Sequence, residues 1–348
     1  MSSSRRGCRP PHEYATRTTP NPNADLLLQV CRKGNSDILC ELLQEPENAQ
    51  VALSWEEWVY IEEEILDVER HEVRESKFNL QLMLQAAAKA GHAFVVRMLF
   101  EFATRSVVKR DYSYSRGDQL INGSTLDAVL KGNSTAVLEV FLDYDPNILN
   151  LSIGMGGDLL GASVGGPSSE PIPRVGHERM MEFLLSRGAD PNKLAPFGSH
   201  PGKPGHYLYY AAWMAGVSVV ELLLEYGAQI SQSGAMHIAA EHNRLDVMEL
   251  LQEHGTDVDE RLEDWGPHTR GSRTRHRPRR EIPLHTAIVH NQHAAAAWLM
   301  VHGADVLIRD ANNDTALDVA ADVGDAEMMK IVGAVDDDTT ITGFMIVD

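Results

Sequence analysis

A block of apolar and polar positions recurs along the second half of the chain. Residues 282–291 read IPLHTAIVHN and residues 314–324 read DTALDVAADVG, and Leu284 aligns with Leu317 at an offset of 33 residues. Self-similarity at such a period is typical of stacked repeats built from a turn and two antiparallel helices. One unit of this size cannot bury its own apolar face, so neighbouring units must pack against one another. The pattern therefore predicts an all-α solenoid.

A second pattern lies within residues 46–78, where the repeat is interrupted. Apolar residues recur there at three- or four-residue steps, which predicts an amphipathic helix over residues 54–75. The opposite face is acidic, with nine Asp or Glu against two Arg between Glu56 and Glu75. We therefore expect an acidic helix inserted between the first two repeats. The apolar residues that define it are Trp55, Trp58, Ile61, Ile65 and Val68.

The repeated segments resemble ankyrin repeats, whose first helix carries a Thr-Pro-Leu-His motif followed by an alanine pair. The clearest copies read HYLYYAAWMAG, GAMHIAAEHNR and IPLHTAIVHNQ, and second helices such as VELLLEYGAQI follow them. Weaker copies, including DLLLQVCRKGN and LMLQAAAKAGH, extend toward the N-terminus. The resemblance implies about eight divergent repeats. They span residues 24–333, with insertions at 46–78, 167–176, 193–205 and 259–281.

Composition and charge narrow the class of partner. The net charge is −19 and aromatic residues make up 6% of the chain. A strongly negative surface keeps a protein soluble and disfavours binding to nucleic acid or to anionic lipid. The charge therefore predicts a protein partner with a basic surface and an association that weakens as salt is added. The oligomeric state stays open.

The cysteines and the two ends of the chain point to an intracellular protein, in the cytoplasm or the nucleus. The three cysteines form no CxxC motif, which favours a reducing compartment. The N-terminal residues lack the apolar core of a secretory signal, and no run of 18 apolar residues indicates a membrane span. Residues 1–23 are polar and are predicted to be a disordered tail. Residues 334–348 begin acidic and end apolar, and we expect them to cap the last repeat.

Motifs for metal, cofactor or catalytic chemistry are not found. His237 and His242 lack the order of a zinc-protease helix, and His237 with His285 occupies the histidine position of the ankyrin motif. The glycine-rich runs at 154–159 and 198–204 lack the spacing of phosphate-binding loops. We expect no catalytic residues, no metal and no cofactor.

The resemblance places partner binding on a concave groove lined by the ends of the first helices. Carried onto this chain, the variable positions after the alanine pair fall in the fifth, sixth and seventh repeats. The fifth repeat is also the most aromatic stretch of the chain, and aromatic residues with a polar edge are frequent interface anchors. The resemblance therefore implies a non-enzymatic interaction module or adaptor. Its predicted partner-binding residues are Tyr207, Trp213, Met214, Glu241, His242 and His290.

An arginine cluster stands out in the insertion at 259–281. Six arginines lie between residues 270 and 280 of an otherwise acidic protein, and mutual repulsion predicts an extended solvated loop. Guanidinium groups suit oxyanions, so the loop is a candidate dock for an acidic peptide or a phosphorylated ligand. A nuclear-import signal and a loop without a dedicated partner are the other hypotheses. The candidate binding residues are Arg273, Arg275 and Arg277.

An alternative hypothesis assigns the protein to a different class. The loop insertions around residues 154–205 contain His177 and His200, and His206 and several tyrosines follow directly. Loops of this kind are able to close a pocket over the stack, which would make the protein an enzyme or a small-molecule binder. An enclosed pocket beside these histidines would favour this alternative, and an open groove would favour the interaction module.

Overall fold

A computed structural model of the chain shows a mainly helical protein with one small sheet. Within its described residues it has seventeen α-helices and three β-strands. Clustering of contacts divides the chain into two compact units, here called unit 1 (1–154 and 167–183) and unit 2 (155–166 and 184–348). The structure describes residues 16–63, 70–108, 120–151, 158–164, 178–193, 206–262, 282–310 and 312–333.

Unit 1 stacks helix pairs, as the repeat pattern predicts. The first helices α1, α4 and α6 pack in sequence against one another, and the second helices α2, α5 and α7 do the same. Apolar side chains such as Leu84, Leu99 and Phe141 are completely buried between them. The bounds are α1 Pro22–Lys33, α2 Ser36–Gln44, α3 Pro46–Ala52, α4 Asn79–Lys89, α5 Ala93–Val108, α6 Gly123–Gly132, α7 Thr135–Tyr144 and the 3-10 helix η3 Pro146–Asn150.

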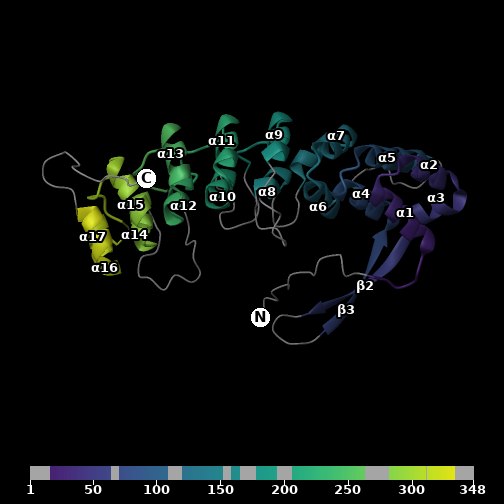
Figure 1. Cartoon of the computed structure of the whole chain (residues 1–348), viewed down its shortest axis with the longest axis horizontal. Helices are drawn as coiled ribbons and strands as arrows, with labels where there is room; N and C mark the ends of the chain where they lie inside the picture. The colour runs from purple at the N-terminus through teal and green to yellow at the C-terminus, as the bar shows by residue number, and fades with distance from the viewer. Residues whose placement is uncertain are drawn as a thin grey trace. The chain divides into compact units, whose positions relative to one another are not determined.

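The amphipathic helix predicted over residues 54–75 is wrong. Strands β2 (Trp55–Glu63) and β3 (Arg70–Phe78) form an antiparallel hairpin, which projects away from the helices of unit 1 (Figure 1). Tryptophan, valine, tyrosine and isoleucine favour strands, and strand pairing sets Glu56 opposite Lys77. Because side chains alternate along a strand, Trp55 and Trp58 lie on opposite faces of β2. The three- and four-residue spacing was therefore not a helical stripe.

The polar tail predicted over residues 1–23 ends earlier than expected. Thr16 and Arg17 form strand β1 (Thr16–Arg17), which pairs with β2 at Trp58 and Val59. Arg17 forms ion pairs with Glu56 on β2 and with Asp25 on α1, and its side chain is buried. Helix α1 begins at Pro22, where a missing N–H costs nothing. Residues 1–15 lie outside the described part of the chain.

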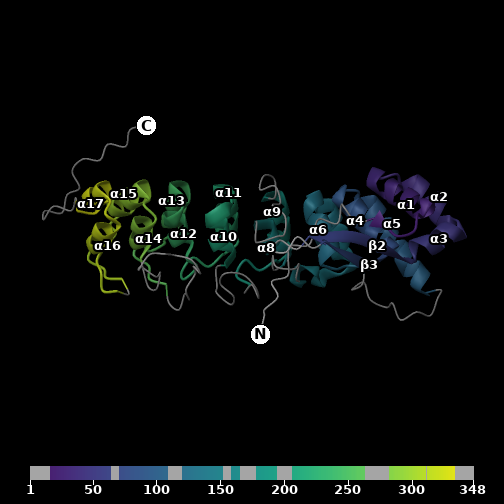
Figure 2. The same ribbon diagram turned by 90° about the horizontal axis from the view of Figure 1, so that it is seen from below.

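Unit 2 repeats one helix pair four times and is the more regular of the two units. First helices α10, α12, α14 and α16 form one row, and second helices α11, α13, α15 and α17 form a second row beside it (Figures 1 and 2). Helix α8 (Leu159–Val164) packs against α10. The bounds are α10 His206–Met214, α11 Val217–Glu225, α12 Ala235–Glu241, α13 Leu245–Glu253, α14 Pro283–Val289, α15 His293–Val301, α16 Ala316–Val323 and α17 Ala326–Gly333.

Small residues explain the close stacking of the first row. Ala211, Ala212, Ala239 and Ala240 are completely buried where α10 and α12 face each other. The helix ends are also specified locally, by Pro283 in the first turn of α14 and by a capping box between Thr315 and Asp318 on α16. Helix α9 (Glu178–Ser186) spans the boundary between the units. The predicted insertion 167–176 lies outside the described residues, as do 194–205 and 263–281.

Candidate functional site

Side chains from three successive first helices meet at the C-terminal ends of α10, α12 and α14. The indole of Trp213 stacks on the imidazole of His242, with ring centres 5.7 Å apart and planes 18° from parallel. His242 follows α12 directly, so this contact joins two neighbouring repeats. Trp213 retains 39% exposure and Met214 is half-buried. The structure thus brings Trp213 and His242, which the sequence predicted as separate binding positions, into one exposed contact.

Glu241 extends this contact to the next repeat. Its Oε1 lies 3.5 Å from Nε2 of His290 after α14 and 3.9 Å from Nε2 of His242. The backbone is fixed beside it, because the Gln292 side chain donates a hydrogen bond to the Glu241 carbonyl at 2.8 Å. Burial raises the pKa of the Tyr209 hydroxyl and the negative charge of Glu241 raises it further, so Tyr209 stays neutral next to the carboxylate. Trp213, Met214, Glu241, His242 and His290 are named here the α10–α14 surface.

Tyr207 has a different place from the other predicted binding residues. Only 3% of it is exposed, and its hydroxyl donates a hydrogen bond of 2.9 Å to Oδ1 of Asp158. That carboxylate also accepts from the Gly161 N–H at the start of α8 and pairs with Lys193 Nζ at 3.1 Å. Tyr207 therefore joins α10 to the N-terminus of α8. The position of Asp158 directly before α8 is a capping signal that the sequence shows. Its contact with Tyr207 has no such signal, because Tyr207 is far away in the sequence.

His206 is the described histidine of the alternative hypothesis. It is buried at the start of α10, with its ring edge-on to Tyr207 and Tyr210. Nδ1 has no hydrogen-bond partner in the described structure, and burial lowers the pKa of the imidazole. This environment holds a neutral ring. His177 and His200 lie outside the described residues, so the predicted pocket around residues 154–205 stays a prediction.

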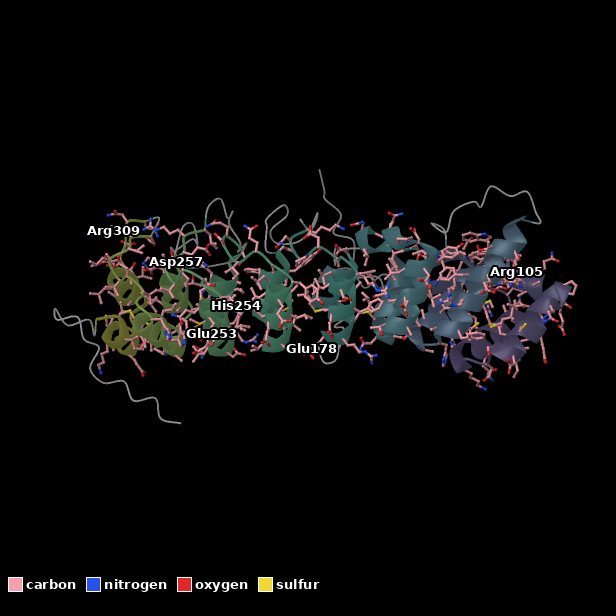
Figure 3. All side chains as sticks on the ribbon, turned by 90° about the horizontal axis from the view of Figure 1, so that it is seen from above. Arg105, Glu178, Glu253, His254, Asp257 and Arg309 are labelled. Atoms are coloured by element: carbon pink, nitrogen blue, oxygen red, sulfur yellow. The ribbon has the colours of Figure 1, made fainter. Side chains whose placement is uncertain are left out.

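The turns between repeats bind one another along unit 2. The Asn192 side chain donates to the Gly227 carbonyl at 2.8 Å, and Gln232 donates its N–H to Glu260 at the same distance. Figure 3 shows Asp257 and Arg309 along the edge from which these turns project. Each turn is therefore held by the next through polar contacts. Arg273, Arg275 and Arg277 belong to a segment outside the described residues, so their predicted role is untested.

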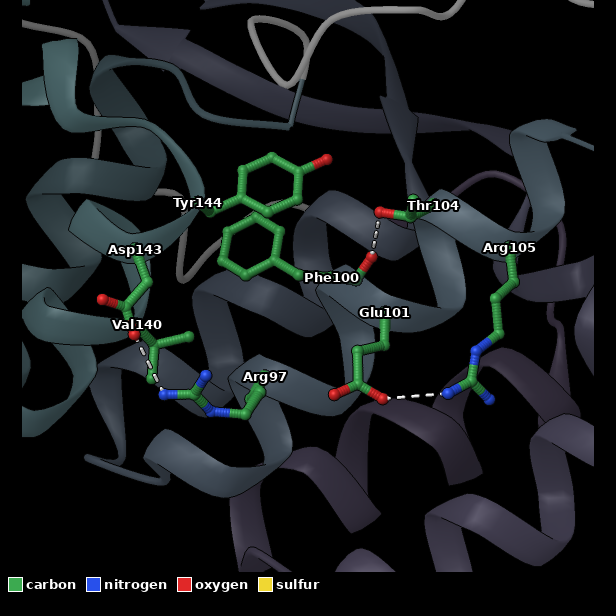
Figure 4. Close-up of a pocket in the computed structure, with 8 residues that line it drawn as sticks. All are labelled: Arg97, Phe100, Glu101, Thr104, Arg105, Val140, Asp143 and Tyr144. Carbon is green, nitrogen blue, oxygen red and sulfur yellow. Dashed lines mark hydrogen bonds and ion pairs between the residues drawn. The ribbon is translucent and has the colours of Figure 1, made fainter.

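A pocket of about 290 Å³ lies between α5 and α7 in unit 1 (Figure 4). Phe100 and Tyr144, which line it, stack with ring centres 4.2 Å apart. The charged side chains around it are already paired, Arg97 with Asp143 at 3.2 Å and Arg105 with Glu101 at 3.1 Å. This pocket was not predicted from the sequence.

The described part of the chain shows neither a metal site nor a membrane-spanning helix. No group of three or more His, Cys, Asp or Glu residues there is arranged to hold a metal ion. Among the helices described, none has both the length and the apolar character needed to cross a membrane.

Comparison with known families identifies the repeat. Residues 173–261, which include α10 to α13, match the family model of ankyrin repeats in three copies. The chain therefore contains ankyrin repeats and folds as a helix-turn-helix solenoid, and both predictions from the repeated motif are confirmed. The count of about eight repeats over residues 24–333 extends past this match and stays a prediction. No curated protein matches the chain.

Proposed function

We propose that unit 2 is a protein-interaction module and that its partner binds on the α10–α14 surface. Ankyrin repeats generally mediate protein–protein interaction. The observation that carries the proposal is the continuous contact from Trp213 through His242 and Glu241 to His290, which spans three repeats. An exposed aromatic residue held rigidly by its neighbours loses little side-chain entropy on binding, which makes Trp213 a suitable anchor.

The charge of the surface favours a basic group on the partner. The Glu241 side chain is about one-third exposed, and its neighbour His242 stacks on the exposed Trp213. A lysine or arginine of the partner would pair with this carboxylate and lie against the indole. The net charge of −19 would draw a basic partner toward the protein over longer distances. No covalent chemistry is part of this function.

Affinity capture with matched variants tests the proposal. Wild-type protein and Trp213→Ala would be used to capture partners from a lysate, and each captured protein would then be purified and titrated by calorimetry. Tyr226→Ala is the matched control, because Tyr226 is also 39% exposed but follows the second helix α11. We expect Trp213→Ala to weaken binding by at least tenfold, which corresponds to about 1.4 kcal/mol, and Tyr226→Ala to leave it unchanged.

A second pair of variants tests the basic group. Glu241→Gln keeps the shape of the side chain and removes its charge, whereas Glu253→Gln removes an exposed charge at the end of α13. We expect only Glu241→Gln to reduce affinity and also to reduce the dependence of affinity on salt. A partner that binds both Glu variants and Trp213→Ala as tightly as wild type would refute this location of the binding surface.

A further inference from the structure

The last repeat of unit 2 has an uncovered end. Helix α14 packs against α16, and α15 packs against α17. No element in the described part of the chain follows α17. Every earlier first helix of this row is covered on that side by the first helix of the next repeat. The residues at this end of α16 and α17 show what such a cover must bury.

One position of the first helix makes the difference measurable. Aligning the repeats by their alanine pairs places Leu208, Met236, Leu284 and Leu317 at the same position of α10, α12, α14 and α16. The first three side chains are 0%, 1% and 0% exposed. Leu317 is 48% exposed. The last repeat therefore presents to solvent a leucine of the kind that the stack elsewhere buries.

The second helices show the same difference. Val220 on α11, Met248 on α13 and Ala296 on α15 are equivalent and completely buried. Their counterpart on α17, Met329, is half-buried. Ala321 on α16 is also exposed, whereas the equivalent Ile288 on α14 is buried. A stack that ends on its own would carry polar residues on this face. The face instead keeps the apolar character of an internal junction between repeats.

We propose that residues 341–347, ITGFMIV, bind this uncovered face of α16 and α17. The described chain leaves α17 at Gly333, and a side-chain carbon at that position would lie 3.9 Å from Cδ1 of Leu317. The following residues thus start at the edge of the apolar face. The seven residues 334–340, AVDDDTT, span up to about 25 Å when extended, and packed helices are about 10 Å apart. The segment is long enough to cross both helices.

The small size of the face favours this occupant over a second copy of the chain. Stable dimer interfaces use about 20–30 residues on each side. The uncovered apolar residues here are few and come from the end of one repeat: Leu317, Ala321 and Met329, with Val323 at the margin. In the sequence, three aspartates at 336–338 precede the apolar residues, and charged side chains of this kind favour solvent over a buried contact. A short apolar segment is sufficient to cover this face.

Hydrogen exchange on the full chain tests the proposal. One variant replaces apolar residues of the segment (Ile341→Ser, Phe344→Ser and Ile346→Ser), and its matched control replaces the connection (Asp336→Ser, Asp337→Ser and Asp338→Ser). We expect amides of residues 316–333 to exchange several-fold faster in the first variant and at the wild-type rate in the control. Residues 206–253 serve as an internal reference for folding and should not change in either protein.

The reciprocal variant keeps the test decisive. Leu317→Asp places a charge in the proposed contact, and we expect faster exchange of residues 341–347 themselves. Light scattering would accompany each measurement. Unchanged exchange in residues 316–333 of the apolar-to-serine variant would overturn the proposal. So would a wild-type dimer that this variant converts to a monomer, because a second copy of the chain would then cover the face.

Discussion

The last turn of the first helix carries different chemistry in the two units. A left-handed residue ends most of these helices and sets the register: Gly34, Gly91 and Asn133 in unit 1, and Asn243, Asn291 and Gly324 in unit 2. At the position two residues before this left-handed residue, unit 1 has Arg32, Lys89 and Lys131. Unit 2 has Glu241, Val289 and Asp322.

The same backbone position therefore carries cations in one unit and carboxylates or apolar groups in the other. A cation in the last turn of a helix interacts favourably with the helix dipole, which accounts for unit 1. Unit 2 lacks this stabilisation. At Glu241 it has instead a carboxylate between His242 and His290. A position that departs from its local optimum is a better indicator of binding than one that follows it. The comparison favours unit 2 as the interaction surface.

The largest expected effect concerns the next position along the helix. On α6 of unit 1 it is Gly132, and after α12 of unit 2 it is the exposed His242. A side-chain carbon at Gly132 would lie 2.2 Å from the Ala88 carbonyl oxygen of α4, so Gly132→Ala must push two helices apart. This cost exceeds the gain of about 1 kcal/mol in helix propensity, and overpacking typically costs about 1–3 kcal/mol. We expect a lower urea midpoint for Gly132→Ala.

Gly216→Ala in unit 2 is the control for this effect. A side-chain carbon there meets only the Ser218 hydroxyl, at an ordinary 3.5 Å. We expect its urea midpoint to stay near that of wild type. A Gly132→Ala protein as stable as wild type would show that α4 and α6 do not approach as closely as the structure has them.

The second effect lies inside unit 2. Tyr207→Phe removes the hydroxyl that donates to buried Asp158 and leaves the aromatic packing in place. Hydrogen bonds to charged groups contribute about 1.5–3 kcal/mol, and Lys193 still pairs with the carboxylate, so we expect a loss near the lower end of this range. Denaturation by urea measures it. Partner binding should not change, because Tyr207 is buried outside the α10–α14 surface. A loss of affinity at unchanged stability would place Tyr207 in the binding site.

The third effect depends on pH and separates His206 from its neighbour. Burial lowers the pKa of His206 below its ordinary value of 6.5, so the unfolded chain takes up this proton at higher pH than the folded one. The associated stability is present above pH 6.5 and is lost as the pH falls below it. We expect His206→Gln to lose less stability than wild type between pH 7.5 and about 5.5. Tyr207→Phe, which removes no group that titrates in this range, should keep the wild-type slope.

The regular half of the molecule was the predictable half. The sequence pattern alone predicts the stack, because its signals act within one repeat or between neighbouring repeats. These signals are Pro283, the alanine pairs and the 33-residue period. The hairpin at residues 55–78 was missed because five apolar residues matched a helical period by chance. The pairing of Glu56 with Lys77 joins two strands, so the sequence of one strand alone does not predict it.

The same limit applies to the site. The positions of Trp213, Glu241 and His242 followed from the repeat register, whereas the burial of Tyr207 depends on Asp158. Residue 158 precedes Tyr207 by 49 positions, across segments that have no repeat pattern to align them.

The smallest expected effect returns to the cations of unit 1. Lys89→Gln removes an exposed charge from the end of α4, and we expect the free energy of unfolding to fall by no more than about 0.5 kcal/mol. Affinity for a partner bound at the α10–α14 surface should be unchanged, since all residues of that surface come from unit 2. Calorimetric titration of Lys89→Gln beside Glu241→Gln measures both. A loss of affinity in Lys89→Gln comparable to that in Glu241→Gln would mean that the partner contacts both units.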